Sequence, residues 1–534
     1  MASPLIRSIA LSTAFAATAG LLPAQAQQPD DDAIPLYTVG LGPLQRPVTT
    51  SVEEAQAWFD QGLQLMYAFA VGDGLRSFRQ AWESDPDCAM CWFGEAWALG
   101  PYLNGGMNDA DEPRAWEAAQ NALRIAQRPG GATAAERAMI EAMAVRYAER
   151  PDPEGRVARD SAYSRAMADA WARFPNDLEI GTLYGESLML LEPRRGVWPL
   201  EKPSVQHIHR VLEEALARDI SHPGACHLYI HATESTPDAG KAEPCADLLG
   251  DAIPGASHIN HMPSHTYNRI GRWSDAVRAN QKAWHSDQKA AIDEGFAIYP
   301  SHNLHMLLFA ASMDGQSAVA IQAARDYGRL VEGGQFYVAL ALMRFGRFEE
   351  LTELDDVPAD PVFEGLWTAA RGIGHLRTGA PDSAQAHLDR VQALIEEHGD
   401  EAQFRGHTAT QLLGVTGGLL ESEILRMAGD DLGALEVLER VVALEDALRY
   451  DEPEPLNFSA RHWLGALELE LGRAEDAEAT YRQALEDHPR NGWSLYGLEQ
   501  SLRAQGRHGD AELVRVEFDR NWEDADIWLR SSRY

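Results

Sequence analysis

Hydrophobic residues recur at helical spacing from about residue 50 to the end of the chain, and strand-like alternation of apolar and polar residues is absent. The segment 463–489 ("WLGALELELGRAEDAEATYRQALEDHP") combines this period with small residues at regular places. Gly506 follows Gly472 by 34 residues, and Ala511 follows Ala477 by the same interval. Small residues let two helices approach closely, and a glycine closes the turn between them. The pattern therefore predicts helical hairpins repeated along the chain.

A period of 34 residues is that of the tetratricopeptide (TPR) repeat. The same skeleton recurs upstream in "FRQAWESDP" (78–86), "GRWSDAVRANQKAW" (271–284), "FGRFEELTEL" (345–354) and "LRTGAPDSAQAHL" (376–388). We expect an all-α chain of roughly ten TPR-like hairpins, stacked as a right-handed superhelical solenoid with a concave groove.

The start of the chain predicts export. Residues 1–26 have the features of a signal peptide: Arg7, then a short apolar stretch, then the small-residue site "AQA". We therefore expect a periplasmic or secreted protein. No later apolar run reaches the about 18 residues of a membrane span, so we expect no membrane anchor. The expected units are the signal peptide 1–26, an extended leader 27–49, N-terminal TPR-like helices 50–170, His- and Glu-rich central repeats 171–330 and C-terminal TPR repeats 331–534.

Acidic residues outnumber basic ones, with 81 Asp and Glu against 46 Lys and Arg and a formal net charge of −35. Such a surface repels phosphate backbones and anionic lipids. We therefore expect no nucleic-acid partner, while cations are favoured near the surface.

Two similar phrases, "CHLYIHATE" at 226–234 and "SHINHMPSH" at 257–265, begin adjacent repeats 31 residues apart. Gly240 and Gly271 stand where the turn glycines of these repeats are expected. The phrases are therefore interpreted as equivalent first helices of neighbouring hairpins. Spacings of three, four and seven residues place the polar side chains of each helix on one side, which we expect to line the concave groove.

The resulting stripe of polar side chains crosses four successive helices. Imidazole and carboxylate groups are common ligands of transition metals, and helices that pack about 8–10 Å apart let one ion be held from both sides. The stripe consists of Glu179, Glu186, His227, His231, Glu234, His258, His261, His265, His302 and His305. We predict a transition-metal site with its ligands among His227, His231, His258, His261, His265, His302 and His305.

Copper or zinc suits such an imidazole-rich site best, and iron or manganese stays open. Seven histidines exceed the needs of one ion, so the pattern fits two ions, or one ion with further histidines that bind substrate. Glu234 and Glu186 are candidates for proton transfer, and Arg269 is a candidate for orienting an anion. The site would then serve a metal-dependent hydrolase or oxidoreductase acting on a small molecule or peptide in the groove. The alternative is a metal-free TPR scaffold that binds an extended peptide or a partner protein.

The four cysteines form two pairs along the sequence. Cys88 and Cys91 are predicted to form a local disulfide in an oxidising compartment. Cys226 and Cys245 are predicted to stay unbonded, because their repeat positions put them at different heights along one hairpin.

Four segments, "DPDCAMCWFGEAWALGPYLN", "CHLYIHATE", "SHINHMPSHTYNRIGRWSDA" and "YPSHNLHML", together resemble a family of exported bacterial TPR proteins. The resemblance extends from about residue 50 to about residue 515. It implies the TPR fold and export, and it implies no particular activity.

Overall fold

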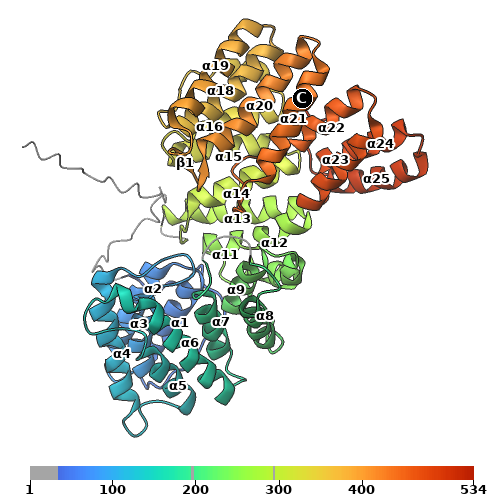
Figure 1. The fold of residues 1–534 in the computed structure, drawn as a ribbon. Coiled ribbons are helices and arrows are strands. Elements are labelled where there is room, and N and C mark those ends of the chain that lie inside the picture. The colour runs from blue at the N-terminus through green and yellow to red at the C-terminus, as the bar shows by residue number, and fades with distance from the viewer. Residues whose placement is uncertain (1–33, 194–197, 293–294) are drawn as a thin grey trace, which may run out of the picture.

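The computed structural model describes residues 34–193, 198–292 and 295–534. The predicted signal peptide 1–26 lies outside them. Regular structure in the described residues is almost entirely helical, and helices that follow one another in sequence pack together. The arrangement in Figure 1 confirms the all-α, TPR-like solenoid of helical hairpins.

The N-terminal helices form the blue and teal part of Figure 1. They are α1 (Glu53–Tyr67), α2 (Val71–Ser84), α3 (Ala89–Ala98), η1 (Asp109–Asp111), α4 (Glu112–Ala126), α5 (Ala134–Met143), η2 (Pro153–Gly155), α6 (Arg156–Arg173) and α7 (Leu178–Met189). Phe59, Phe78 and Trp97 belong to one buried apolar core. Helix α1 approaches α2 closely because Gly62 has no side chain: a Cβ there would stand 2.7 Å from the ring of Phe78.

The central helices are drawn in green between the two ends of the chain (Figure 1). They are α8 (Pro203–Leu216), α9 (Pro223–Thr233), η3 (Ala239–Ala242), α10 (Glu243–Leu249), α11 (Ser257–His261), α12 (Pro263–Ile270), α13 (Trp273–Ala290), α14 (Pro300–Met313) and α15 (Ser317–Leu330). The helix expected for "SHINHMPSH" is divided into α11 and α12, because Pro263 has no N–H to continue the backbone hydrogen bonds. Met262 keeps helical dihedral angles, so His261 and His265 still lie one turn apart on one face.

Most of the C-terminal helices share one large apolar core with the central ones. They are α16 (Phe336–Arg344), α17 (Phe348–Glu353), α18 (Pro361–Arg377), α19 (Pro381–His398), α20 (Ala409–Met427), α21 (Asp431–Asp446), α22 (Arg461–Glu470), α23 (Ala474–Asp487), α24 (Gly492–Ala504) and α25 (His508–Asn521). Two short antiparallel strands, β1 (Gln403–Phe404) and β2 (His407–Thr408), join α19 to α20.

The loop 450–455, between α21 and α22, returns to the central helices. Tyr337 of α16 donates a 3.0 Å hydrogen bond to the backbone oxygen of Pro455, and Nε2 of His488 lies 3.0 Å from each carboxylate oxygen of Glu454. These contacts hold the loop beside α12 and α14, where it forms one wall of the site described below.

The turn glycines Gly271, Gly315, Gly472 and Gly506 all adopt left-handed backbone angles, with φ between 71 and 75°. Glycine reaches this region without the steric cost that a side chain brings. Gly240 differs, because it lies inside the 3-10 helix η3.

Both cysteine pairs form disulfides. The Cys88–Cys91 bond confirms the prediction. The expectation that Cys226 and Cys245 stay apart is wrong, since their Cα atoms are 5.1 Å apart and their sulfurs are bonded. The prediction assumed a full-length first helix, whereas α9 ends at Thr233 and the chain turns back early through η3, which brings α10 level with Cys226.

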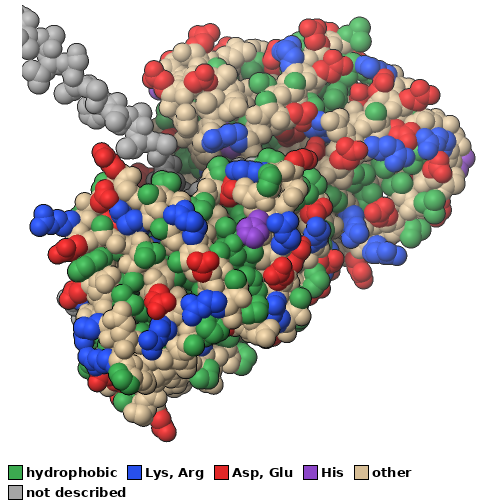
Figure 2. All heavy atoms as spheres, turned by 60° about the horizontal axis from the view of Figure 1, so that its bottom comes forward, with side chains coloured by type: hydrophobic (Ala, Val, Ile, Leu, Met, Phe, Trp, Pro, Cys, Tyr) green, Lys and Arg blue, Asp and Glu red, His purple; other side chains and the backbone are tan. Residues whose placement is uncertain are grey.

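Acidic and basic side chains are interspersed on the face drawn in Figure 2, and histidine shows at few places on it. A stretch with the length and hydropathy of a transmembrane helix is absent from the described part of the chain.

Candidate metal centre

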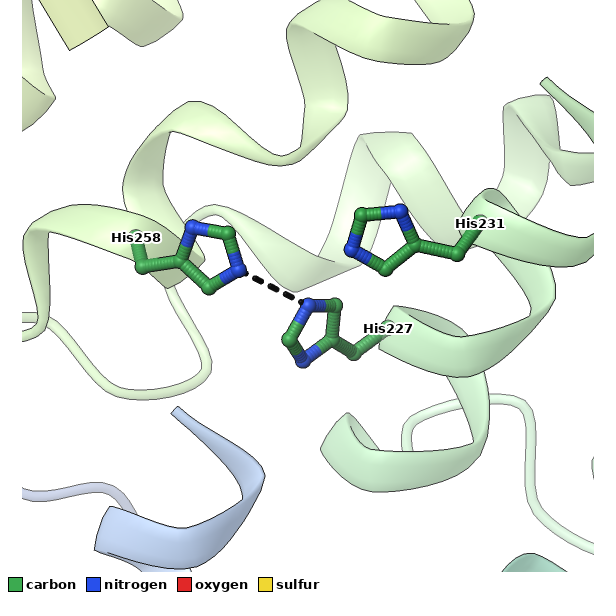
Figure 3. A group of neighbouring side chains, drawn as sticks. All are labelled: His227, His231 and His258. Atoms are coloured by element: carbon green, nitrogen blue, oxygen red, sulfur yellow. Dashed lines mark hydrogen bonds between the residues drawn. The ribbon is translucent and has the colours of Figure 1, made fainter. Parts of the chain in front are cut away.

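Three histidines from α9 and α11 form a first group, here called triad 1: His227, His231 and His258. One ring nitrogen of each lies within 4.8 Å of the other two. The Nε2 atoms of His227 and His258 are 3.1 Å apart. Figure 3 shows one nitrogen of each ring facing the space between the three rings, with His227 and His231 on one side and His258 on the other.

Three more histidines, from α11, α12 and α14, form triad 2: His261, His265 and His302. Their ligand atoms also lie within 4.8 Å of one another. The Nε2 atoms of His261 and His265 are 2.9 Å apart. Two nitrogens bound to one ion at about 2.0–2.1 Å stand about 3 Å apart, so this separation fits a pair of neighbouring ligands.

Hydrogen bonds fix the orientation of two rings in triad 1. Nδ1 of His227 donates to the backbone oxygen of Tyr67 at 2.7 Å, and Nδ1 of His231 donates to Oε1 of Glu234 at 2.7 Å. A neutral imidazole carries one N–H, so Nε2 of each ring then presents a lone pair. Nε2 of His231 is buried and has no hydrogen-bond partner. An unsatisfied buried nitrogen is costly, and a metal ion would satisfy it.

The same arrangement recurs in triad 2. Nδ1 of His261 lies 3.1 Å from Oδ1 of Asn280, and Nδ2 of Asn280 donates to the backbone oxygen of Ala276 at 2.8 Å. The amide is thereby fixed with its oxygen as acceptor, so His261 is the donor. Nδ1 of His265 donates to Oε2 of Glu234. In their neutral forms His261 and His265 therefore point two Nε2 lone pairs at each other, which repel unless a cation lies with them.

Glu234 connects the two triads. One carboxylate oxygen accepts from His231 of triad 1 and the other accepts from His265 of triad 2. Burial raises the pKa of Glu234, but the two imidazoles outweigh burial and hold the pKa well below its ordinary value. A negative charge is thus kept directly behind one histidine of each triad, which strengthens both as ligands.

Four of the six triad imidazoles are held in their neutral form. Burial, followed by the nearby imidazoles, lowers the pKa of His227, His258, His261 and His302 well below the usual value. Neutral imidazole is the form that binds a metal ion.

Surrounding groups cover most of the triad histidines, and by its side chain only His302 among them is partly exposed. His227 and His258 are 1% exposed and His261 is fully buried. The ring of Phe69 covers triad 1, with its centroid 4.3 Å from that of His227 and 5.3 Å from that of His258. A peptide lying in the groove would therefore not reach these rings.

A small cavity of about 40 Å³ lies beside triad 2 and has room for a few water-sized molecules. His265, Arg269, Tyr450 and Glu452 line part of it. Glu452 also belongs to a third group of possible ligands, with His231 and Glu234. Its side chain is 30% exposed, so this wall connects the triads with solvent.

Besides Glu234, three of the predicted site residues lie outside the triads. Nε2 of His305 is 2.6 Å from the hydroxyl of Tyr337, and His305 belongs to no ligand group in the described residues. Glu186 accepts a 3.3 Å bond from the indole of Trp97, and burial raises its pKa. Arg269 faces the cavity, with its guanidinium 5.9 Å from the ring centre of Tyr450.

Sequence reasoning missed four residues that shape the site: Tyr67, Phe69, Asn280 and Glu452. Tyr67 acts through its backbone oxygen, for which no side-chain pattern exists. Phe69 and Glu452 come from loops of distant repeats. Asn280 lies on the buried face of α13. A buried amide on that face was the one signal in the sequence that could have pointed to it.

No family model matches the sequence, and no curated protein is significantly similar to it. Among solved structures, the APC/C hetero-tetramer Cut9–Hcn1 matches at 13% identity and a TM-score of 0.30, over 87% of this chain and 79% of that chain. The human IFIT1 dimer with m7Gppp-AAAA matches at 12% identity and a TM-score of 0.30, over 90% and 91%. The P58(IPK) TPR domain matches at 11% identity and a TM-score of 0.20, over 85% and 98%. Likeness at this level carries no argument about what the present chain binds.

Proposed function

We propose that the chain is an exported metalloprotein that binds a transition metal through triads 1 and 2. Copper or zinc is favoured, because every ligand of the triads is an imidazole and no thiolate joins them. Iron and manganese sites more often include carboxylates, and the carboxylate of Glu234 is already engaged by two Nδ1 atoms.

The facing Nε2 atoms of His261 and His265 are the observation that carries this proposal. Asn280 and Glu234 accept from the other nitrogen of each ring, so with both rings neutral, as a metal ion requires, two lone pairs meet 2.9 Å apart in a buried place. A metal ion bound to both nitrogens turns this repulsion into two bonds. Hydrogen bonding to a peptide would not need the nitrogens to converge.

The cavity beside triad 2 supports an enzymatic role, with a small molecule as the substrate. A hydrolase or an oxidoreductase needs an open coordination position and a group that moves protons. Glu452 is better placed for proton transfer than Glu234, because it lines the cavity and its side chain is 30% exposed, whereas that of Glu234 is 3% exposed. Arg269 lines the same cavity and can orient an anionic part of the substrate. A protein partner on the outer TPR surface is compatible with this role.

Elemental analysis of the exported protein, purified without a His-tag or chelator, tests the proposal. We expect stoichiometric metal in the wild type and loss of the metal in a His231→Ala/His265→Ala double variant. His285→Ala is the matched control, because His285 is exposed on α13 and outside the triads. A protein that holds no metal as purified and binds none of copper, zinc, iron or manganese on reconstitution would leave the scaffold alternative.

A further inference from the structure

We infer that, given the metal site proposed above, triads 1 and 2 form one dinuclear copper centre that binds dioxygen between its two ions. Each triad supplies three nitrogens to one ion, which leaves each ion an open position. Six imidazoles exceed the four ligands of a single tetrahedral ion, so one ion would leave buried nitrogens unsatisfied.

The two triads adjoin each other without a layer of other side chains between them. The ring centroids of His258 and His261 are 5.3 Å apart, and those of His231 and His265 are 5.5 Å apart. Within triad 2, the centroids of His261 and His265 are 4.6 Å apart. Rings of different triads are therefore nearly as close as rings of one triad. Two ions held by them approach the separation of two-metal sites, about 3.5–4 Å, at which one small ligand touches both.

Glu234 links the two triads from the side opposite the ions. It accepts from Nδ1 of His231 and Nδ1 of His265, so a single carboxylate orients one ligand of each ion. We regard it as a positioning residue for both ions.

The charge of the surroundings favours copper in its monovalent state. Among the described residues, Glu234 and Glu452 are the carboxylates that lie within 4.8 Å of a triad nitrogen in a group of possible ligands. Two divalent ions would bring four positive charges into a buried site with two carboxylates. Two cuprous ions bring only two positive charges, so they leave less uncompensated positive charge beside these carboxylates and Arg269. Of the two favoured metals, copper and zinc, copper has a stable monovalent state. Imidazole binds monovalent copper well.

Two cuprous ions at this spacing supply the electrons that dioxygen needs. Each ion gives one electron, so dioxygen is reduced by two electrons to peroxide, and the two ions become cupric. Two copper–oxygen bonds form while the O–O bond order falls from two to one. The step needs no proton and no further reductant, and its reversal releases dioxygen. The cavity of about 40 Å³ beside His265 admits a diatomic molecule but not a peptide, and Phe69 covers the other side.

The decisive measurement uses the wild-type protein loaded with copper(I) without oxygen. We expect two copper ions per chain, and uptake of one dioxygen per chain when oxygen is admitted. The oxidised protein should absorb strongly in the near ultraviolet and should give little electron paramagnetic resonance signal, because two cupric ions that share a ligand couple their spins.

Variants that remove one ligand from one triad separate the two ions. His258→Ala and His302→Ala should each hold one copper per chain, take up no dioxygen and, after treatment with an added one-electron oxidant, give the resonance signal of an isolated cupric ion. His285→Ala should behave as the wild type. Circular dichroism checks that each variant is folded, and His258→Asn and His302→Asn replace any that is not.

The possible failures are distinguishable. One copper per chain in the wild type, or two cupric ions that give independent resonance signals, would overturn the dinuclear centre and leave the metalloprotein intact. Two zinc ions with no binding of copper would overturn the copper and dioxygen assignment. Binding of no metal at all would also remove the function proposed above.

Discussion

Nδ1 of His227 donates a 2.7 Å hydrogen bond to the backbone oxygen of Tyr67, which lies 160 residues earlier in the chain. Through this bond the last residue of α1 holds a histidine of triad 1 in place. Because a backbone oxygen can only accept, it also fixes the tautomer of His227 and directs Nε2 toward His258. The position of α9 relative to α1 therefore controls a candidate ligand.

Gly224→Ala should disturb this support. A Cβ at Gly224 would stand 2.4 Å from the ring of Tyr67, so α9 must move away from α1. We expect a loss of about 1–3 kcal/mol in the free energy of unfolding, as for other overpacked sites, together with weaker metal binding. Thermal and denaturant unfolding measure the first effect, and metal competition measures the second. Gly509→Ala is the control, because nothing lies within 4 Å of a Cβ there, and its stability should change by less than about 1 kcal/mol.

Glu234→Gln should weaken metal binding without abolishing it. The variant keeps the shape of the side chain but loses the charge behind His231 and His265. Loss of such a supporting group costs about 10–100-fold in metal affinity. Competition with a chromophoric chelator gives the dissociation constant, and the exposed Glu436→Gln serves as the control. An affinity equal to the wild type would show that Glu234 has no part in supporting the ligands.

Asn280 should affect metal affinity only because its side-chain oxygen accepts a hydrogen bond from His261. Asn280→Leu removes the acceptor and frees the imidazole to rotate, whereas Asn280→Asp keeps an oxygen in the same place. We expect the Leu variant to lose about tenfold or more in metal affinity and the Asp variant to retain most of it. Equal losses in the two variants would indicate a packing effect instead.

The two disulfides should differ in their contribution to stability. Cys226–Cys245 closes a loop with a sequence separation of 19, and Cys88–Cys91 closes one with a separation of 3. By the chain-entropy relation, removal costs about 3 kcal/mol for the first and about 2 kcal/mol for the second. Chemical unfolding of the two double Cys→Ser variants measures the difference. Thiol titration of the denatured, unreduced protein should find no free thiol, and two free thiols per chain would contradict the second bond.

Asp287 should make the protein less stable as the pH rises toward neutrality. Burial raises the pKa of Asp287 from 3.8 to about 7 in the folded protein. The folded state therefore holds a proton that the unfolded state has lost, so the free energy of unfolding falls between about pH 4 and pH 7. Asp287→Asn cannot ionise, and its stability relative to the wild type should rise by on the order of 2 kcal/mol across this range. Denaturant unfolding at several pH values tests this, and a constant difference between the two proteins would contradict it.

The sequence predicted the parts of the site that follow helical spacing. His227 and His231 share one face of α9, and the 31-residue offset between the two phrases placed His258 and His265 on the equivalent face of the next repeat. The turn glycines confirmed the repeat register at Gly271. Periodicity is a local signal, and it was sufficient for residues within one hairpin and its neighbour.

The remaining features depend on contacts that periodicity does not encode. His305 has the expected spacing, yet it turns to Tyr337 of the following hairpin. Glu452 reaches the triads from a loop far along the chain. The prediction for Cys226 and Cys245 failed because α9 is shorter than a regular repeat helix. In each case an irregular segment, rather than the repeat, decides the contact.

Loop 450–455 has a consequence for how the interior is completed during synthesis. His302, the last imidazole of the triads, emerges from the ribosome well before Tyr450 and Glu452, which form the wall beside triad 2. A nascent or C-terminally shortened chain thus carries all six imidazoles while one side of their chamber is still missing. The proposed metal ligands would therefore all precede loop 450–455 in the chain, and the loop would serve to close the chamber around them.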